Sequence, residues 1–257
     1  MRFDYHTHSN YSDGEFLGWM VRAAEQAGLE GIGFADHCNV SPREEDRTWT
    51  AAMGFNLDLT YERRRAGIER VRERYDIRVF DAVEMDYDPR DESEIGTFLD
   101  EVGFDYTIGS VHTLEDVNVH FERYFAKKSE AERRELVSEY FDKLVALVDS
   151  ELFDIAAHPD LIERNPALRG FATDEQYHRV AKAFEESRTI PEINAGRVTR
   201  DYGEFHPSPA FMAVLSEYDI AFTLGSDAHE PEAIGERKEE LEKFVALHGL
   251  ETVEPVG

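Results

Sequence analysis

Short apolar runs alternate with longer amphipathic stretches along the whole chain. The runs are rich in β-branched and aromatic residues, which predicts strands at residues 2–6, 30–36, 77–85, 104–110, 153–157, 190–194 and 220–225. In the stretches between them apolar residues recur every three or four positions, which predicts helices at residues 15–27, 60–75, 92–101, 130–149, 174–187, 208–217 and 231–247. Uninterrupted strand–helix units favour one parallel barrel over an open sheet with two domains. We therefore expect residues 1–257 to form a single α/β domain, a barrel of the (β/α)7 type.

The segment 38–59 lacks this regularity. It is acidic and aromatic and shows no clear period. A connection of this length without an element of its own usually carries function. We therefore predict a long loop that lies over the functional site.

Metal-binding types of side chain gather at the ends of the predicted strands. Residues two apart in a strand project to the same side, so His6 and His8 point together, as can Asp227 and His229 near the other end of the chain. The other candidates end or follow the intervening strands, with one just past the first strand: Asp13, His37, Glu84, His112 and His158. Because all strands of a parallel barrel end at one rim, we expect these residues to converge there.

Each of these residues alone has an ordinary structural explanation, such as a hydrogen-bonded histidine or a turn aspartate. Together, however, six of the ten histidines and three carboxylates fall at strand ends. Such a cluster is costly to desolvate unless divalent metal binds it, and nitrogen and oxygen donors suit Zn²⁺, Mn²⁺ or Fe²⁺. Nine donors are too many for one ion, so we predict two or three ions with Glu84 as a bridge. Ion clusters of this kind catalyse displacement at phosphorus.

The chain is strongly acidic, with 55 Asp and Glu against 28 Lys and Arg and a formal net charge of −27. We expect no nucleic-acid or membrane partner, because their binding requires basic patches. No apolar run has the roughly 18–20 residues of a membrane span, and no signal region is evident at the N-terminus. We therefore expect a cytoplasmic enzyme, monomeric or homo-oligomeric, that acts on a small molecule. The single cysteine, Cys38, excludes an internal disulfide and is either core filler or a spare ligand.

The motifs at the strand ends resemble those of the polymerase and histidinol phosphatase (PHP) superfamily. That family carries an HxH near the N-terminus, a DH after the second strand and a C-terminal SDAH. The corresponding stretches here are His6–His8, Asp36-His37 and Ser226–His229. The match runs in order over essentially the whole chain. Four further stretches resemble the stand-alone histidinol-phosphatase group: Glu84–Tyr87, Gly109–His112, His158–Leu161 and Glu192–Gly196.

The resemblance implies a distorted seven-stranded TIM-like barrel with a trinuclear metal site, in which a metal-bridging hydroxide attacks phosphorus. One metal would be held by His6, His8, Glu84 and Asp227, a second by Glu84, His112 and His158, and a third by Asp13, His37 and His229. The implied reaction is hydrolysis of a phosphomonoester, most specifically of L-histidinol phosphate in histidine biosynthesis.

The residues that would contact the substrate are less constrained by the motifs. Arg197 and Arg164 are candidates to clamp the phosphate, because a guanidinium pairs two oxygens at once. A surface arginine paired with a carboxylate is the alternative for either. His206 or Asp227 could protonate the leaving alkoxide, and Asp86 could receive the ammonium group of the substrate.

Three other functions stay open. A PHP phosphoesterase could act on nucleotides or other small phosphoesters, and a PHP module could bind metal without catalysis. An amidohydrolase-type barrel would also use an HxH and a late aspartate. Such barrels usually carry a carboxylated lysine where Glu84 stands here.

The charge imbalance predicts that stability depends on salt. Self-repulsion of a net charge of −27 destabilises the compact state unless salt screens it, as inside a halophilic archaeon. The melting temperature is therefore expected to rise between low salt and molar KCl. A melting temperature that stays constant over this range would remove the halophilic hypothesis.

Overall fold

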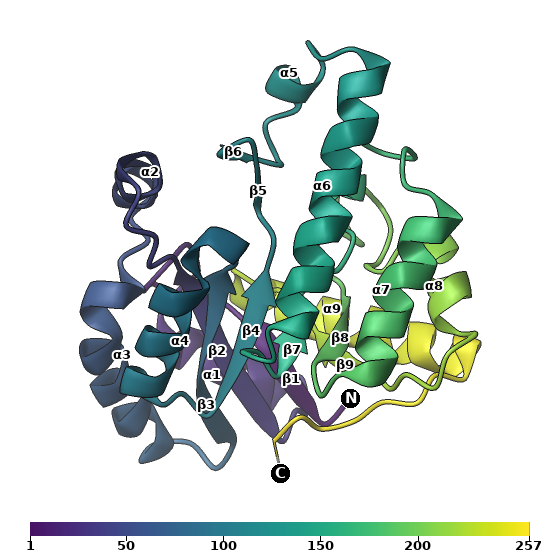
Figure 1. Ribbon diagram of the computed structural model, residues 1–257. Coiled ribbons are helices and arrows are strands. Elements are labelled where there is room, and N and C mark those ends of the chain that lie inside the picture. The colour runs from purple at the N-terminus through teal and green to yellow at the C-terminus, as the bar shows by residue number, and fades with distance from the viewer. Residues whose placement is uncertain (257) are drawn as a thin grey trace.

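The computed structural model describes residues 1–256 and contains a parallel sheet of seven strands, nearly closed into a barrel (Figure 1). The strands are β1 (Phe3–Thr7), β2 (Gly31–Cys38), β3 (Arg78–Asp86), β4 (Tyr106–Ser110), β7 (Ile155–Ala156), β8 (Ile190–Asn194) and β9 (Thr223–Gly225). They lie side by side in chain order. This topology confirms the distorted (β/α)7 TIM-like barrel, although β7 and β9 are shorter than the sequence pattern predicts.

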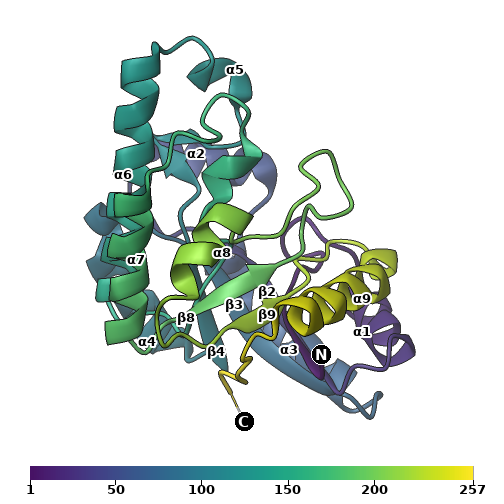
Figure 2. The ribbon, with the colours of Figure 1, turned by 90° about the vertical axis from the view of Figure 1, so that its right-hand side faces the viewer.

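Helices surround the sheet (Figures 1 and 2). They are α1 (Leu17–Gln26), α3 (Leu57–Arg72), α4 (Glu92–Val102), α6 (Glu130–Asp149), α7 (Asp174–Glu186), α8 (Pro209–Leu215) and α9 (Pro231–His248). Capping boxes at Ser129 and Thr173 satisfy the first backbone N–H groups of α6 and α7, which begin at the predicted residues. None of the helices formed by residues 1–256 combines the length and apolarity that a membrane crossing needs.

The segment 38–59 is not the long loop expected from the sequence. It contains helix α2 (Glu44–Met53), and α3 already begins at Leu57. Helix α2 buries only Asp46 and Thr50, so it has no apolar stripe that periodicity could reveal. It projects beside the mouth of the barrel (Figure 1).

Several short elements were not predicted from the sequence, because each is too short to show a repeating pattern of apolar residues. They are the hairpin β5 (Thr113–Leu114) and β6 (Val117–Asn118), helix α5 (Glu122–Phe125), and the 3₁₀ turns η1 (Pro89–Asp91) and η2 (Leu161–Arg164). The hairpin and α5 rise above the barrel mouth (Figure 1).

The two ends of the chain complete the barrel. The backbone N–H of Asp227 donates to the carbonyl of His6 at 2.7 Å, and that of His8 donates to the carbonyl of Ala228 at 2.9 Å. These bonds join the end of β1 to the segment after β9. The HxH and SDAH stretches therefore lie side by side although more than two hundred residues separate them in sequence.

A bulge in β1 sets the direction of its side chains. Over residues 4–7, three steps along β1 oppose two steps along β2. Side chains beyond such a bulge change face. Tyr5 packs on Phe80 inside the barrel, and His6, its neighbour in sequence, also points inward and reaches Glu84 on the same face of β3.

Aromatic rings fill the end of the barrel opposite the strand carboxyl ends. Phe3, Tyr5, Phe80 and Tyr106 pack with ring centroids 5.5–6.0 Å apart. Val256 covers this cluster near the C-terminus, and its carbonyl accepts a bond from the Tyr5 hydroxyl at 3.4 Å. The apolar plug leaves the opposite rim free for polar side chains.

A buried arginine joins α3 to the sheet. Arg64 is fully buried, and its guanidinium donates to Asp36 Oδ2 at 2.9 Å and to Asp81 Oδ1 at 2.7 Å. It also bonds the backbone carbonyls of Phe34 and Ala82. Two buried carboxylates thus share Arg64, and Asp81 also pairs with Arg65 Nε at 2.7 Å.

Arg64→Ala is expected to lower the free energy of unfolding by about 3–5 kcal/mol, because it removes the cation paired with buried Asp36 and one of the two cations paired with Asp81. Urea unfolding at constant salt measures the loss. Arg70→Ala is the matched control on the same helix, since the Arg70–Glu73 pair is exposed and contributes about 0–1 kcal/mol. Equal losses in the two variants would contradict this role of Arg64.

Candidate metal centre

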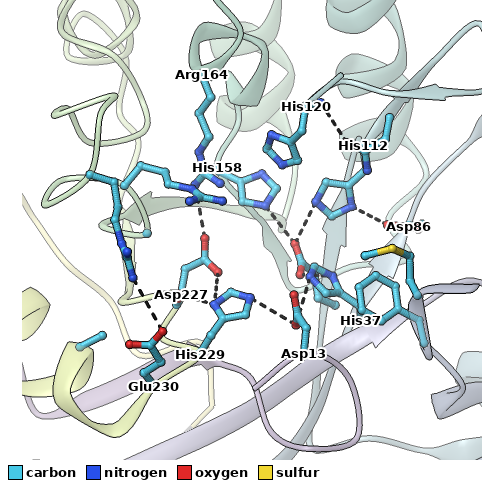
Figure 3. Close-up of a pocket in the computed structure, with 18 of the residues that line it drawn as sticks. Asp13, His37, Asp86, His112, His120, His158, Arg164, Asp227, His229 and Glu230 are labelled. Atoms are coloured by element: carbon cyan, nitrogen blue, oxygen red, sulfur yellow. Dashed lines mark hydrogen bonds and ion pairs between the residues drawn. The ribbon is translucent and has the colours of Figure 1, made fainter. Parts of the chain in front are cut away.

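The donor residues identified from the sequence lie around one cavity at the carboxyl ends of the strands (Figure 3). Seven of them line the cavity itself, namely Asp13, His37, Glu84, His112, His158, Asp227 and His229. His6 and His8 are fully buried directly beneath and contact Glu84. The structure therefore brings all nine side chains together.

Glu84 lies at the centre of the group and is fully buried. Its Oε2 atom lies 2.8 Å from His37 Nδ1 and 3.4 Å from His6 Nε2. Its Oε1 atom lies 2.9 Å from His158 Nε2 and 3.5 Å from His112 Nε2. His8 Nε2 also lies 3.7 Å from Oε2, so each oxygen faces at least two imidazoles, as expected for a carboxylate that bridges two ions.

Asp13 and Asp227 form the second part of the group. Asp13 Oδ1 lies 3.3 Å from His229 Nε2, 3.8 Å from His37 Nε2 and 3.7 Å from His8 Nδ1. Asp227 Oδ1 lies 3.3 Å from His8 Nε2. The ring of His8 therefore stands between these two carboxylates.

Other carboxylates hold the imidazoles from behind. Glu192 Oε1 contacts His6 Nδ1 at 2.8 Å, and Asp86 Oδ1 contacts His112 Nδ1 at 2.5 Å. Contacts of this kind fix the tautomer and leave the far nitrogen for a ligand. Asp86, the candidate for the substrate ammonium group, also lines the cavity. Glu192 received no role from the sequence, although its burial at the end of β8 follows from the same strand-end reasoning.

Asp36 supports the loop that carries Asp13. It is fully buried and accepts bonds from the Ser9 backbone N–H at 2.6 Å, the Ser9 hydroxyl at 2.8 Å and the Ser12 hydroxyl at 2.8 Å. Its other partner is Arg64. The aspartate of the DH motif therefore positions the loop after β1, while His37 beside it faces the cavity.

The charges of the cluster compensate one another. Burial lowers the pKa of His158 to about 4 against the opposing pull of Glu84, and burial with the nearby His229 and His37 lowers that of His8 to about 4. Burial also acts on His37, but Glu84 and Asp13 overcome it and raise its pKa to about 10. His8 and His158 are therefore neutral at pH 7, the protonation state in which imidazole binds metal.

Divalent metal ions fit this set of donors. Among residues 1–256, the buried atoms without a hydrogen-bond partner include His6 Nε2, His8 Nε2 and Glu84 Oε2, and such atoms are costly unless something binds them. Donor atoms within 4.8 Å of one another form three sets: His8, Asp13, His37 and His229; His6, His8 and Asp227; and His37, Glu84 and His112. Cys38 belongs to none of these sets within the described chain and packs in the hydrophobic core.

The backbone is also shaped around the cluster. His158 and Asp227 have positive φ angles of 27° and 53°, which non-glycine residues rarely adopt and which occur preferentially at functional sites. Gly225 lies against the barrel interior, where a Cβ atom would come within 1.8 Å of Glu192 Oε1 and 2.6 Å of His6 Cβ. Only glycine leaves room for that pair.

The cavity above the donors encloses about 350 Å³. Four arginines line it: Arg164, Arg197, Arg200 and Arg237. Arg164 is nearly buried and donates to Asn194 Oδ1 at 3.1 Å and to Asp227 Oδ2 at 3.3 Å. Arg197 is exposed, and within residues 1–256 its guanidinium makes neither an ion pair nor a hydrogen bond. Both candidate clamps therefore border the space above the donors.

His206 occupies a different place from the one that a proton donor requires. It is fully buried behind Arg164 and does not line the cavity formed by the described residues. Its Nδ1 atom contacts Asp160 Oδ1 at 2.5 Å, and its Nε2 atom accepts a bond from Arg164 Nε at 2.9 Å. Both nitrogens are occupied, so the imidazole has no proton free for a substrate. His206 orients Arg164 instead.

His120 also lines the cavity, although no sequence motif pointed to it. It is exposed, and it lines the cavity above His112 and His158 (Figure 3). It follows β6, a strand of two residues, and so its placement depends on an element that the sequence pattern did not reveal.

The fold and the side chains at its rim identify the class of protein. It is a parallel barrel with a site for divalent metal ions, made of imidazoles and carboxylates. The model of the PHP domain family matches residues 4–196. The chain therefore belongs to the PHP domain family.

Relatives and solved structures agree with this assignment. The chain is 28% identical over 239 residues to a probable histidinol-phosphatase of Deinococcus radiodurans, covering 91% of this chain and 87% of that one. It is 26% identical over 241 residues to a histidinol-phosphatase of Lactococcus lactis, covering 89% and 84%.

Two crystal structures share the fold. That of histidinol phosphate phosphatase from Lactococcus lactis, complexed with zinc, L-histidinol and phosphate, has a TM-score of 0.72 at 24% identity and covers 95% of this chain and 93% of that chain. A putative histidinol phosphatase from Listeria monocytogenes has a TM-score of 0.74 at 19% identity, with coverage of 91% and 97%.

Glu192→Gln is expected to weaken the binding of a divalent ion by about 10–100-fold, because the uncharged amide no longer fixes and polarises His6. Calorimetric titration of chelator-treated protein with Mn²⁺ or Zn²⁺ measures the affinity. Glu186→Gln, on the exposed end of α7, is the control and should leave the affinity unchanged. Equal affinities in Glu192→Gln and the unmodified protein would remove the supporting role of Glu192.

Proposed function

We propose that this protein is a metal-dependent phosphomonoesterase that hydrolyses L-histidinol phosphate to L-histidinol and phosphate. The observation that supports this proposal most directly is that the nine-donor cluster and Arg164 lie at one cavity. Hydrogen bonds hold the guanidinium of Arg164 beside the cluster. Membership in the PHP family supports the reaction class. The names of the relatives, and the L-histidinol and phosphate in the Lactococcus structure, support this substrate.

We assign two or three divalent ions, Mn, Fe or Zn, to overlapping donor sets. One ion would use His6, His8, Glu84 and Asp227, a second Glu84, His112 and His158, and a third Asp13, His37 and His229. The placement of Glu84 supports the first two sets, because its Oε2 atom faces His6 and His8, besides His37, and its Oε1 atom faces His112 and His158. When bound, the ions supply positive charge for the phosphate oxygens and an activated water nucleophile.

The side chains of the cavity would hold and orient the substrate. Arg164, fixed by Asn194 and Asp227, and the unpaired Arg197 would bind phosphate oxygens in paired hydrogen bonds. As the water oxygen bonds to phosphorus, the ester P–O bond breaks and the leaving alkoxide takes a proton. Asp227 lines the cavity and remains the candidate to pass that proton from the water. Asp86 would face the ammonium group of the substrate.

We also propose that residues 1–257 act as one PHP barrel domain. The support is the contact between the ends of the chain, since Asp227 and Ala228 bond the backbone of His6 and His8. Neither half of the chain alone would hold the full donor set.

Phosphate release by the manganese-loaded protein in high salt tests the proposed substrate. Histidinol phosphate is expected to have a kcat/KM about tenfold or more above that of p-nitrophenyl phosphate, because only the former offers an ammonium group to the acidic rim. Exhaustive chelation is expected to abolish both reactions. Equal kcat/KM values would contradict histidinol phosphate as the substrate, and activity that survives chelation would contradict the metal-dependent class.

A further inference from the structure

One wall of the cavity is apolar. Trp49, Met53, Phe55 and Phe121 line it. They come from two separate segments, α2 with the residues after it and the turn after β6, both of which rise above the barrel rim (Figure 1). Figure 3 places Arg164 and Asp227 on one side of the donor cluster and His37 and Asp86 on the other. The apolar wall belongs to the His37 side, since Phe55 packs on that ring.

Aromatic rings meet at two places on this wall, one beside the donors and one between the two segments. Phe55 lies 4.8 Å from the ring of His37, with an interplanar angle of 36°. Trp49 and Phe121 meet edge to face with ring centroids 5.4 Å apart at 81°. This last contact joins α2 to the segment after β6. A flat group bound above the donors would therefore have aromatic faces or edges beside it.

Apolar surface is unusually exposed on this wall. Met53 is 45% exposed and Phe121 is 46% exposed, and they are two of only six large hydrophobic side chains exposed among residues 1–256. Exposed apolar surface in a cavity is unfavourable in water and becomes favourable when an apolar group covers it. On a chain with a net charge of −27, its position beside the donor cluster indicates a ligand.

The wall is held in place from its base. Arg43 precedes α2 and pairs with Asp46 at 2.5 Å and with Asp91 at 2.7 Å. Both carboxylates are buried, so these pairs are shielded from solvent. The Arg43–Asp91 pair thereby joins the start of α2, the helix that carries Trp49, to the segment after β3.

Resting on the phosphatase function proposed above, we propose that Trp49, Phe55 and Phe121 form the subsite for the alcohol part of the substrate and select phosphomonoesters whose alcohol carries a flat ring. Phosphate bound between the donors and Arg164 leaves the alcohol to extend toward the opposite wall. There a ring gains stacked or edge-to-face contacts, which an aliphatic chain cannot form. The imidazole of histidinol has the required shape.

A matched pair of esters tests the selection. L-Histidinol phosphate and L-alaninol phosphate carry the same phosphate and ammonium groups, but only the first has a ring. Trp49→Ala is expected to lower the ratio of their kcat/KM values by about tenfold, mainly through the KM of histidinol phosphate, and Trp49→Phe should restore most of the ratio. Trp19→Ala is the control, because Trp19 is exposed on α1 and lies outside the cavity.

A ratio that Trp49→Ala leaves unchanged would overturn the proposal, as would an unmodified enzyme that hydrolyses both esters equally well. An equal loss on both esters would also overturn it, since that result assigns Trp49 to the general shape of the site. A fall in the ratio that Trp49→Phe reverses supports the subsite.

Fluorescence separates the subsite from the proposed reaction. The chain has two tryptophans, so Trp19→Phe leaves Trp49 as the single reporter. In the zinc-loaded variant, L-histidinol with inorganic phosphate is expected to change the emission of Trp49, whereas L-alaninol with phosphate is not. If the emission responds but neither ester is hydrolysed, the phosphatase function fails and the subsite stands. Absence of any response to L-histidinol, in an enzyme that hydrolyses its phosphate, overturns the subsite alone.

Discussion

The burial of one carboxylate, Glu84, constrains everything around it. It has no exposure to solvent, and both of its oxygens face imidazoles at 2.8–3.5 Å. An anion in such a place is stable only if cations or hydrogen-bond donors stay close. Four of the surrounding strand ends supply these partners, so each strand must end where its imidazole reaches the same point. The positive φ of His158 is one local consequence, since strain of this kind persists only where the surroundings enforce it.

Closure of the barrel makes that convergence possible. The backbone bonds between His6 and Asp227 and between His8 and Ala228 join the first strand to the segment after the last. Behind the donors, Glu192 and Asp36 turn side chains and loops toward the rim, and His206 does the same for Arg164. These residues touch no substrate in the proposed reaction, yet they determine where the groups that do so can lie.

The sequence predicts the barrel well because its strands and helices have regular apolar periods, and α6 even begins and ends at the predicted residues. The convergence of the nine side chains could be predicted because strand ends in a parallel barrel share a rim. Elements without a regular spacing of apolar residues were not predicted. Helix α2 buries two polar residues and no apolar stripe, and His120 follows a two-residue strand. The proton-donor role of His206 failed for another reason, since only the fold shows that Asp160 and Arg164 occupy both ring nitrogens.

The cavity that results is polarised, with arginines near Asp227 and aromatic rings near His37. In the proposed reaction this asymmetry gives the substrate one orientation, provided that a cluster of ions is bound at the base of the cavity. The number of divalent ions bound per chain shows whether that cluster forms. Elemental analysis of manganese-loaded protein, freed of excess metal, should find two or three ions per chain, and fewer in Glu84→Gln. One ion or none in the unmodified protein would show that the nine donors do not act as a single cluster.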